Sequence, residues 1–141
     1  MIKSIETSLK ELKIKCTPVE PEEDISQIIA DLEDTLKTQK GYALAANQIG
    51  YKKQIAVVRM DKVTVNLINP EIISKETKIR FPESCLSFPG LQVQTSRYQS
   101  VLIESGQKDR QRFIFNGLEA VVCQHEIDHL KRNSFYRKLI L

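Results

Sequence analysis

The sequence predicts an α+β fold in which small antiparallel or mixed sheets pack around helices. Two observations predict it: several short strand-like runs are separated by turn residues, and segments with helical periodicity stand before and after them. Such runs favour pairing between neighbours along the chain. With 141 residues and no internal repeat or linker, the chain is expected to form a single domain over residues 1–141.

The first helix is predicted just before Gly41. Its apolar residues recur at the spacing of one helical face, with acidic residues early in the segment and Lys37 and Lys40 late. Gly41 is a typical helix stop. The pattern is that of an amphipathic helix of about four turns. Its apolar face comprises Ile25, Ile28, Ile29, Leu32 and Leu36.

The predicted strands follow this helix. They are residues 54–60, 63–68, 91–95, 99–104 and 112–115. Asn69-Pro70 ends the second run, and Ser105-Gly106 marks a turn. Residues 82–90 are rich in turn formers, so a loop is expected there.

A last helix is predicted from Asn116, with Glu119 in the position of a capping box. Apolar residues point around most of its circumference, so it is expected to be buried on nearly all sides. They are Leu118, Ala120, Val121, Val122, Cys123, Ile127 and Leu130. Burying histidine and acidic side chains on a helix costs free energy unless they are paired, so metal coordination and hydrogen bonding are the expected compensation.

Composition excludes several function classes. The net charge of +3 is spread along the chain, and no run of like charge predicts a nucleic-acid or membrane patch. The N-terminus lacks the apolar run of a secretory signal, and no stretch approaches transmembrane length. Three cysteines do not make a disulfide framework, which favours a reducing cytoplasm.

The two histidines of the chain lie in the segment Gln-His-Glu-Ile-Asp-His-Leu, at residues 124–130. His125 and His129 are four residues apart and share a helical face, so both can bind one metal ion while Glu126 reaches a water on it. The alternative is two solvated histidines that share a face by chance.

Two histidines leave a catalytic metal site incomplete, because such sites usually have three protein ligands and one open position. With no further histidine, the third ligand must be Cys, Asp or Glu. Cys123 faces away from the histidines, and Cys16 has no neighbouring motif. Cys85, in the turn-rich segment, is able to reach the metal, with the N–H of Leu86 pointing into the same site.

Three segments, in order, resemble the three motifs of peptide deformylases. The family patterns are G-x-G-x-A-A-x-Q, E-G-C-x-S and Q-H-E-x-D-H-L. The matching segments here are residues 41–48, 83–87 and 124–130. The resemblance extends over nearly the whole chain and implies the family's fold, with small sheets around a metal-binding helix.

The resemblance implies an enzyme that removes the formyl group from the N-terminal formylmethionine of nascent polypeptides. One divalent ion, Fe²⁺ by family habit with Zn²⁺, Ni²⁺ or Co²⁺ as substitutes, would be held by Cys85, His125 and His129. Glu126 would move the water's proton, and Gln48 with the N–H of Leu86 would stabilise the developing oxyanion. The expected partners are formylmethionyl peptides and, transiently, the ribosome, in a bacterial cytoplasm.

Further residues take roles from the resemblance. A peptide is expected to pair with the strand edge near the first motif. The substrate-contacting positions would be Gly41, Tyr42, Ala43, Leu44, Val121 and Val122. Glu83, Arg97 and Asp128 would orient the metal ligands.

Three residues depart from the family pattern: Ala43, Ser84 and Arg132 stand where glycine is usual. Ala43 adds a methyl group near the substrate backbone, and Ser84 would be strained if that position needed a positive φ. The chain also stops at Leu141, without the long C-terminal helix of many bacterial members. Because some bacteriophages carry short forms, a phage-infected host is one expected source.

Two alternative functions remain open. A zinc endopeptidase of the H-E-x-x-H type would need a third His or Glu after the helix, and the residues after Leu130 contain neither. A non-enzymatic binding protein on a decayed deformylase scaffold would explain the three departures. Formate release from a formylmethionyl peptide separates the enzyme from the decayed scaffold.

Overall fold

The computed structural model describes residues 1–61 and 63–131. Three α-helices and a short 3₁₀-helix accompany two three-stranded antiparallel sheets within those residues. The helices are α1 (Leu9–Leu12), α2 (Ser26–Lys37), η1 (Ala46–Ile49) and α3 (Gly117–Lys131). The strands are β1 (Ala43–Ala45), β2 (Ile55–Met60), β3 (Val63–Ile68), β4 (Glu71–Cys85), β5 (Phe88–Ser105) and β6 (Gln111–Asn116).

The first sheet has the strand order β1-β2-β3 and is covered on both faces. Successive side chains of a strand point to opposite faces, and β2 divides its residues accordingly. Ile55 and Val57 pack with the apolar face of α2, whereas Ala56 and Val58 pack with α3. Burial on both faces explains why the four successive residues 55–58 are all apolar.

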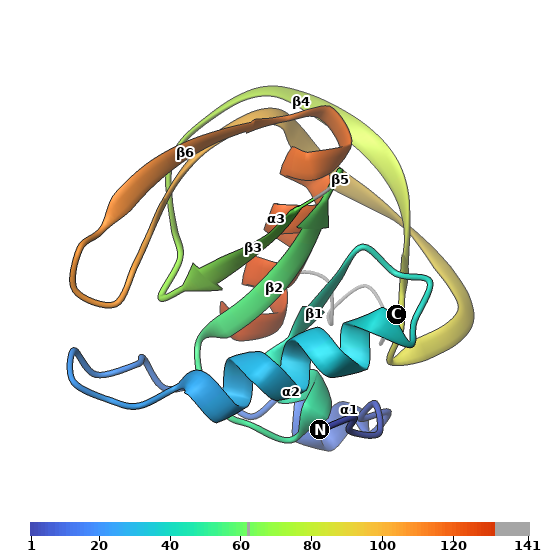
Figure 1. Cartoon of the computed structure of the whole chain (residues 1–141). Coiled ribbons are helices and arrows are strands. Elements are labelled where there is room, and N and C mark those ends of the chain that lie inside the picture. The colour runs from blue at the N-terminus through green and yellow to red at the C-terminus, as the bar shows by residue number, and fades with distance from the viewer. Residues whose placement is uncertain (62, 132–141) are drawn as a thin grey trace.

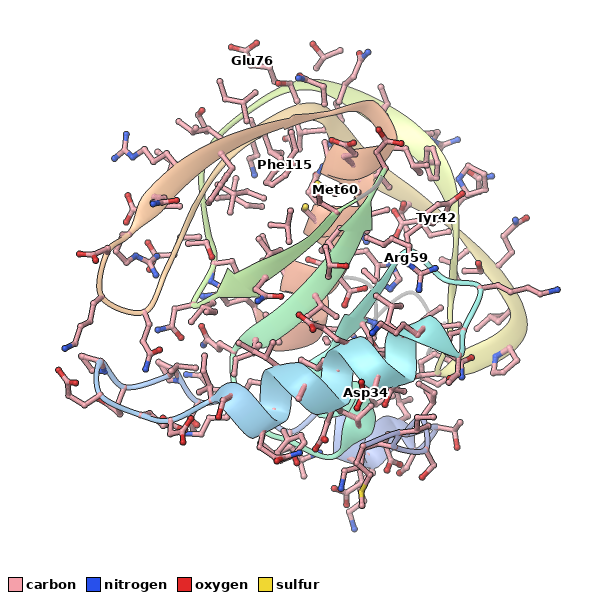
Figure 2. The ribbon with its side chains drawn as sticks, in the orientation of Figure 1. Asp34, Tyr42, Arg59, Met60, Glu76 and Phe115 are labelled. Carbon is pink, nitrogen blue, oxygen red and sulfur yellow. The ribbon has the colours of Figure 1, made fainter. Side chains whose placement is uncertain are left out.

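The second sheet has the order β4-β5-β6 and arches over α3 (Figure 1). Its inner face contributes Val101, Ile103 and Phe115 to the core cluster that also contains α3 residues. In Figure 2, Phe115 and Met60 point into the space between the sheets, whereas Glu76 on β4 points outward. The helix α3 contacts β1, β2, β5 and β6, and so lies at the centre of the molecule.

The α+β class, the amphipathic helix and the buried C-terminal helix are confirmed. Two expectations about the middle of the chain are wrong. Residues 71–85 form one long strand, where a loop was expected over 82–90. The two short runs predicted within 91–104 are parts of β5, which is continuous over 18 residues.

Candidate metal centre

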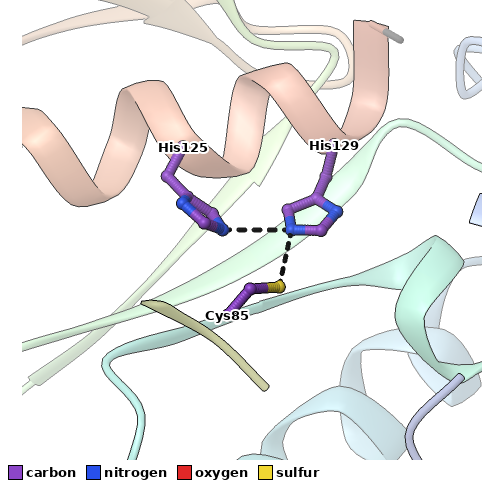
Figure 3. Close-up of side chains that lie close together, drawn as sticks. All are labelled: Cys85, His125 and His129. Atoms are coloured by element: carbon purple, nitrogen blue, oxygen red, sulfur yellow. Dashed lines mark hydrogen bonds between the residues drawn. The ribbon is translucent and has the colours of Figure 1, made fainter. Parts of the chain in front are cut away.

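Three side chains converge between α3 and the end of β4. The ligand atoms of Cys85, His125 and His129 all lie within 4.8 Å of one another. Nε2 of His129 is 3.3 Å from Cys85 Sγ and 3.1 Å from His125 Nε2. Figure 3 shows both imidazole rings on the same side of α3, turned toward Cys85. The structure thus brings together the three residues predicted as ligands, with Cys85 at the end of a strand instead of in a loop.

Glu83 fixes the orientation of the His125 ring. His125 Nδ1 lies 2.7 Å from Glu83 Oε1. Burial favours the neutral carboxyl, but hydrogen bonds from Arg97 and His125 outweigh it and lower the pKa of Glu83 to about 2. An ionised carboxylate only accepts hydrogen bonds, so Nδ1 carries the proton. In the neutral imidazole, which is the form that binds a metal, this leaves the lone pair on His125 Nε2, on the side of the ligand cluster.

A buried arginine joins the hairpin to the helix. Arg97 on β5 donates to Glu83 through Nε at 2.6 Å and Nη2 at 2.8 Å, and its Nη1 donates to Asp128 on α3. Glu83 also accepts a hydrogen bond from Thr95. Two carboxylates facing one guanidinium leave an excess negative charge beside the ligand cluster, which favours a cation there.

Glu126 is buried next to the ligands. Its Oε2 has no hydrogen-bond partner within residues 1–61 and 63–131. Burial raises the pKa of its carboxyl to about 7. Such a group is suited to take up and release a proton near neutral pH. One thiol, two imidazoles and this unpaired carboxyl oxygen fit a catalytic metal ion with three protein ligands and an open position.

The comparisons with known proteins agree with this geometry. The family described as polypeptide deformylase matches residues 2–140. The chain belongs to the polypeptide deformylase family. A peptide deformylase of Aquifex aeolicus is 36% identical over 126 residues, which cover 84% of this chain and 75% of the relative.

Two solved deformylase structures have the same fold. The peptide deformylase of Legionella pneumophila has a TM-score of 0.89 at 30% identity, covering 98% of this chain and 86% of that chain. The enzyme of the Vibrio parahaemolyticus bacteriophage VP16T, solved with actinonin, has a TM-score of 0.84 at 32% identity, covering 92% of this chain and 96% of that chain.

Membership confirms the predicted family, fold class and enzyme class. Peptide deformylases are metal-dependent hydrolases that remove the N-formyl group from nascent polypeptides, and this is the function predicted for the chain. A metal cofactor is likewise supported by the ligand cluster. Within the described residues, no helix is long and apolar enough to span a membrane.

A cavity of about 710 Å³ opens beside the ligands. It is lined by most of the residues predicted to contact the substrate, namely Gly41, Tyr42, Ala43, Val121 and Val122. Leu44 is different: it is fully buried in the core with α2 and does not line the cavity, because its side chain points to the other face of β1. The contact of Leu44 with substrate stays a prediction, and the position of its side chain does not favour it.

Two of the three departures from the family pattern, Ala43 and Ser84, lie in the described part of the chain. Ala43 and Ser84 both line the cavity. Within the described residues, the non-glycine residues with positive φ are Asp61, Asn69 and Thr77, so Ser84 carries no strain of that kind. Arg132 lies outside the described residues.

The two predicted oxyanion donors, Gln48 and the N–H of Leu86, both lie close to Cys85. Gln48 Nε2 is 3.5 Å from Cys85 Sγ. Leu86 follows Cys85 in the turn between β4 and β5, and its side chain packs against Gly41. A Cβ atom on Gly41 would lie 3.1 Å from Leu86 Cδ1, so this glycine makes room for Leu86.

Sequence reasoning missed several polar residues that hold the site together. Asn47 Nδ2 donates to the backbone oxygen of His129 at 2.9 Å and lies 3.4 Å from that of Leu12. Gln124 pairs its side-chain amide with both backbone groups of Tyr98, which fixes α3 to β5. Both residues lie in the segments that resemble the family motifs, so the resemblance was the signal that could have identified them.

Proposed function

We propose that this chain hydrolyses the formamide bond of N-terminal formylmethionine in nascent polypeptides, with one Fe²⁺ ion held by Cys85, His125 and His129. The observation that carries the proposal is the convergence of their three ligand atoms within 4.8 Å beside the unpaired oxygen of Glu126. Family resemblance favours Fe²⁺, and a thiolate with two imidazoles also suits Zn²⁺, Ni²⁺ or Co²⁺.

A divalent ion bound there would lower the pKa of a coordinated water and supply a nucleophile near neutral pH. Glu126 accepts the proton of the attacking water through its carboxylate, and then donates it to the leaving amine nitrogen. The support for this role is the position of Glu126 next to a ligand, with an oxygen left without a partner in the described part of the chain.

Gln48 and Leu86 stabilise the oxygen of the formyl group as it gains negative charge. The side-chain amide of Gln48 lies against Cys85, and the backbone N–H of Leu86 belongs to the residue after that ligand. Hydrogen-bond donors fixed before the reaction need no reorganisation when the charge develops.

The methionine side chain occupies the apolar part of the cavity. Val121 and Val122 line it from α3, and Leu118 lies one turn earlier on the same helix. Tyr42, labelled in Figure 2, is 56% exposed and stands at the outer rim. Because Val121 and Val122 make this part of the cavity apolar and Ala43 adds a methyl group to its lining, an unbranched side chain fits better than a branched one.

The cellular setting follows from the substrate. Formylmethionyl chains emerge from bacterial ribosomes, so the enzyme meets the ribosome transiently, in the cytoplasm of a bacterium or of a phage-infected host. Cys16, Cys85 and Cys123 are all buried free thiols, which agrees with a reducing compartment.

The test compares matched peptides that start with formylmethionine or acetylmethionine. The protein is loaded with Fe²⁺ without oxygen, and release of formate or acetate is measured. The formyl peptide should be cleaved, and the acetyl peptide should react roughly 10- to 200-fold more slowly, because an enclosed site has no room for the additional methyl group.

Two results would replace this proposal. Cleavage of internal peptide bonds would indicate an endopeptidase. Binding of the formyl peptide without formate release, by protein with a full complement of metal, would indicate a binding protein on a decayed scaffold.

A further inference from the structure

Ser87 is a buried residue of the second motif that the mechanism above does not use. It lies two residues after Cys85, in the two-residue turn that joins β4 to β5, and is 1% exposed. Its Oγ accepts a hydrogen bond of 3.1 Å from Gln48 Nε2. The hairpin that supplies Cys85 therefore also contacts the side chain of Gln48.

The contacts of Gln48 fix which end of its carboxamide faces the site. The backbone N–H of Ala45 donates to Gln48 Oε1 at 2.9 Å. A backbone N–H only donates, so the atom that it meets must be the carboxamide oxygen. The NH₂ group consequently lies on the side of Ser87 and Cys85.

An NH₂ group has two N–H donors, so one N–H donated to Ser87 Oγ leaves the other for the site. The nitrogen also lies 3.5 Å from Cys85 Sγ, so this second donor is at the edge of the ligand cluster. The terminal torsion of a glutamine is broad, so a bond to its oxygen alone leaves the amide free to rotate. The hydroxyl of Ser87 removes this freedom.

We propose that Ser87 is a positioning residue for oxyanion stabilisation, whose hydroxyl holds the Gln48 amide so that its second N–H faces the acyl oxygen of the substrate. This inference rests on the proposed function. Because small misplacements of a group that acts in the transition state cost rate, loss of the hydroxyl should lower kcat and leave KM nearly unchanged.

A double-mutant cycle between Ser87→Ala and Gln48→Ala tests the proposal in the metal-loaded enzyme. Removing an oxyanion donor costs roughly 100- to 1,000-fold in kcat. The loss of kcat in Gln48→Ala is therefore the largest loss that Ser87 can cause by acting through Gln48. Ser87→Ala should lower kcat about 10- to 100-fold, with full metal content. If Ser87 acts through Gln48, the double variant should be no slower than Gln48→Ala alone.

Ser105→Ala is the matched control. Ser105 is also buried, and its hydroxyl bonds to the backbone of Ile68, away from the ligand cluster. This variant should keep the wild-type kcat, even if it is less stable. If Ser87→Ala does not fold, Ser87→Cys takes its place, because it keeps nearly the same volume and replaces the oxygen acceptor with a weak sulfur one.

A second measurement is independent of activity. The side-chain NH₂ signals of Gln48, assigned by their absence in Gln48→Ala, should be shifted and exchange faster with solvent in Ser87→Ala. Unchanged signals, or rate losses of Ser87→Ala and Gln48→Ala that multiply in the double variant, would overturn the positioning role. A wild-type protein that releases no formate would refute the proposed function instead, while the NMR comparison would still decide whether Ser87 holds Gln48.

Discussion

The two sides of the ligand cluster are built differently. The helix α3 is buried over most of its length, and it presents His125 and His129 from a fixed face. Cys85 comes from β4, whose residues are exposed over most of the strand and become buried only near its end. The difference shows that a metal-ligating residue needs buried, hydrogen-bonded surroundings only close to its own position, and not along its whole strand. On the hairpin side this support comes from Glu83 and the β4–β5 turn.

The largest expected effect concerns the ligand of the hairpin side. Cys85→Ala should lose the metal and all activity, because two imidazoles on one helix do not complete the site. Cys123→Ala is the matched change on the helix side and should keep its metal, since Cys123 lies in the core between the sheets. Metal content is measured in reducing buffer, and an active Cys85→Ala protein with one metal per chain would refute the ligand assignment.

The helix side is tested with a variant that should lose the chemical step and still bind the metal. Glu126→Ala should retain metal and fold, yet lose about 100- to 10,000-fold in rate, the typical cost of a positioned general base. Glu119→Ala changes an exposed acid of the same helix and should have the wild-type rate. If Glu126→Ala were isolated without metal, Glu126 would be a structural residue.

The connection between the two sides is tested through Arg97. Arg97→Met leaves Glu83 and Asp128 buried without their cation, which should lower the free energy of unfolding by about 3–5 kcal/mol. Arg112→Met removes an arginine that is 60% exposed and pairs with Glu104, so it should cost less than about 1 kcal/mol. Urea unfolding measures both variants, and equal small losses would show that the two sides are stable independently.

The smallest expected effect comes from the packing behind Leu86. In Gly41→Ala, the added Cβ would lie 3.1 Å from Leu86 Cδ1 and displace the turn, which should lower kcat about tenfold. Adding Leu86→Ala should restore most of the rate. Gly50→Ala, at a positive φ with open space around it, should reduce stability and leave kcat unchanged. A Gly41→Ala enzyme with the wild-type kcat would rule out this packing role.

The same two sides differ in how well the sequence predicts them. The α3 region combines helical periodicity with a local metal-binding spacing, and both signals depend on residues that are close together in sequence. The first half of β4 is exposed on both faces, so it lacks the alternation that identifies a half-buried strand. Pro82 and Ser84 are turn formers, but an edge strand tolerates proline.

The break predicted within β5 has a related cause. Arg97 interrupts the apolar pattern with a charge, which resembles a loop residue in the sequence. In the structure this side chain is buried and paired with Glu83 and Asp128, at sequence separations of 14 and 31 residues. Pairings at such distances carry no periodic signal in a single sequence, and only the family resemblance indicated Arg97.

The amide of Asn47 also has a consequence for the order of folding. It joins η1 to the His129 backbone across 82 residues, whereas β4 and β5 pair around a two-residue turn. Closing a long loop costs more entropy than closing a short hairpin, so contacts of this range form late. The hairpin with Cys85 should therefore form before the histidines reach it. Since the complete ligand set exists only in the native state, the free energy of metal binding adds directly to the stability of the folded chain.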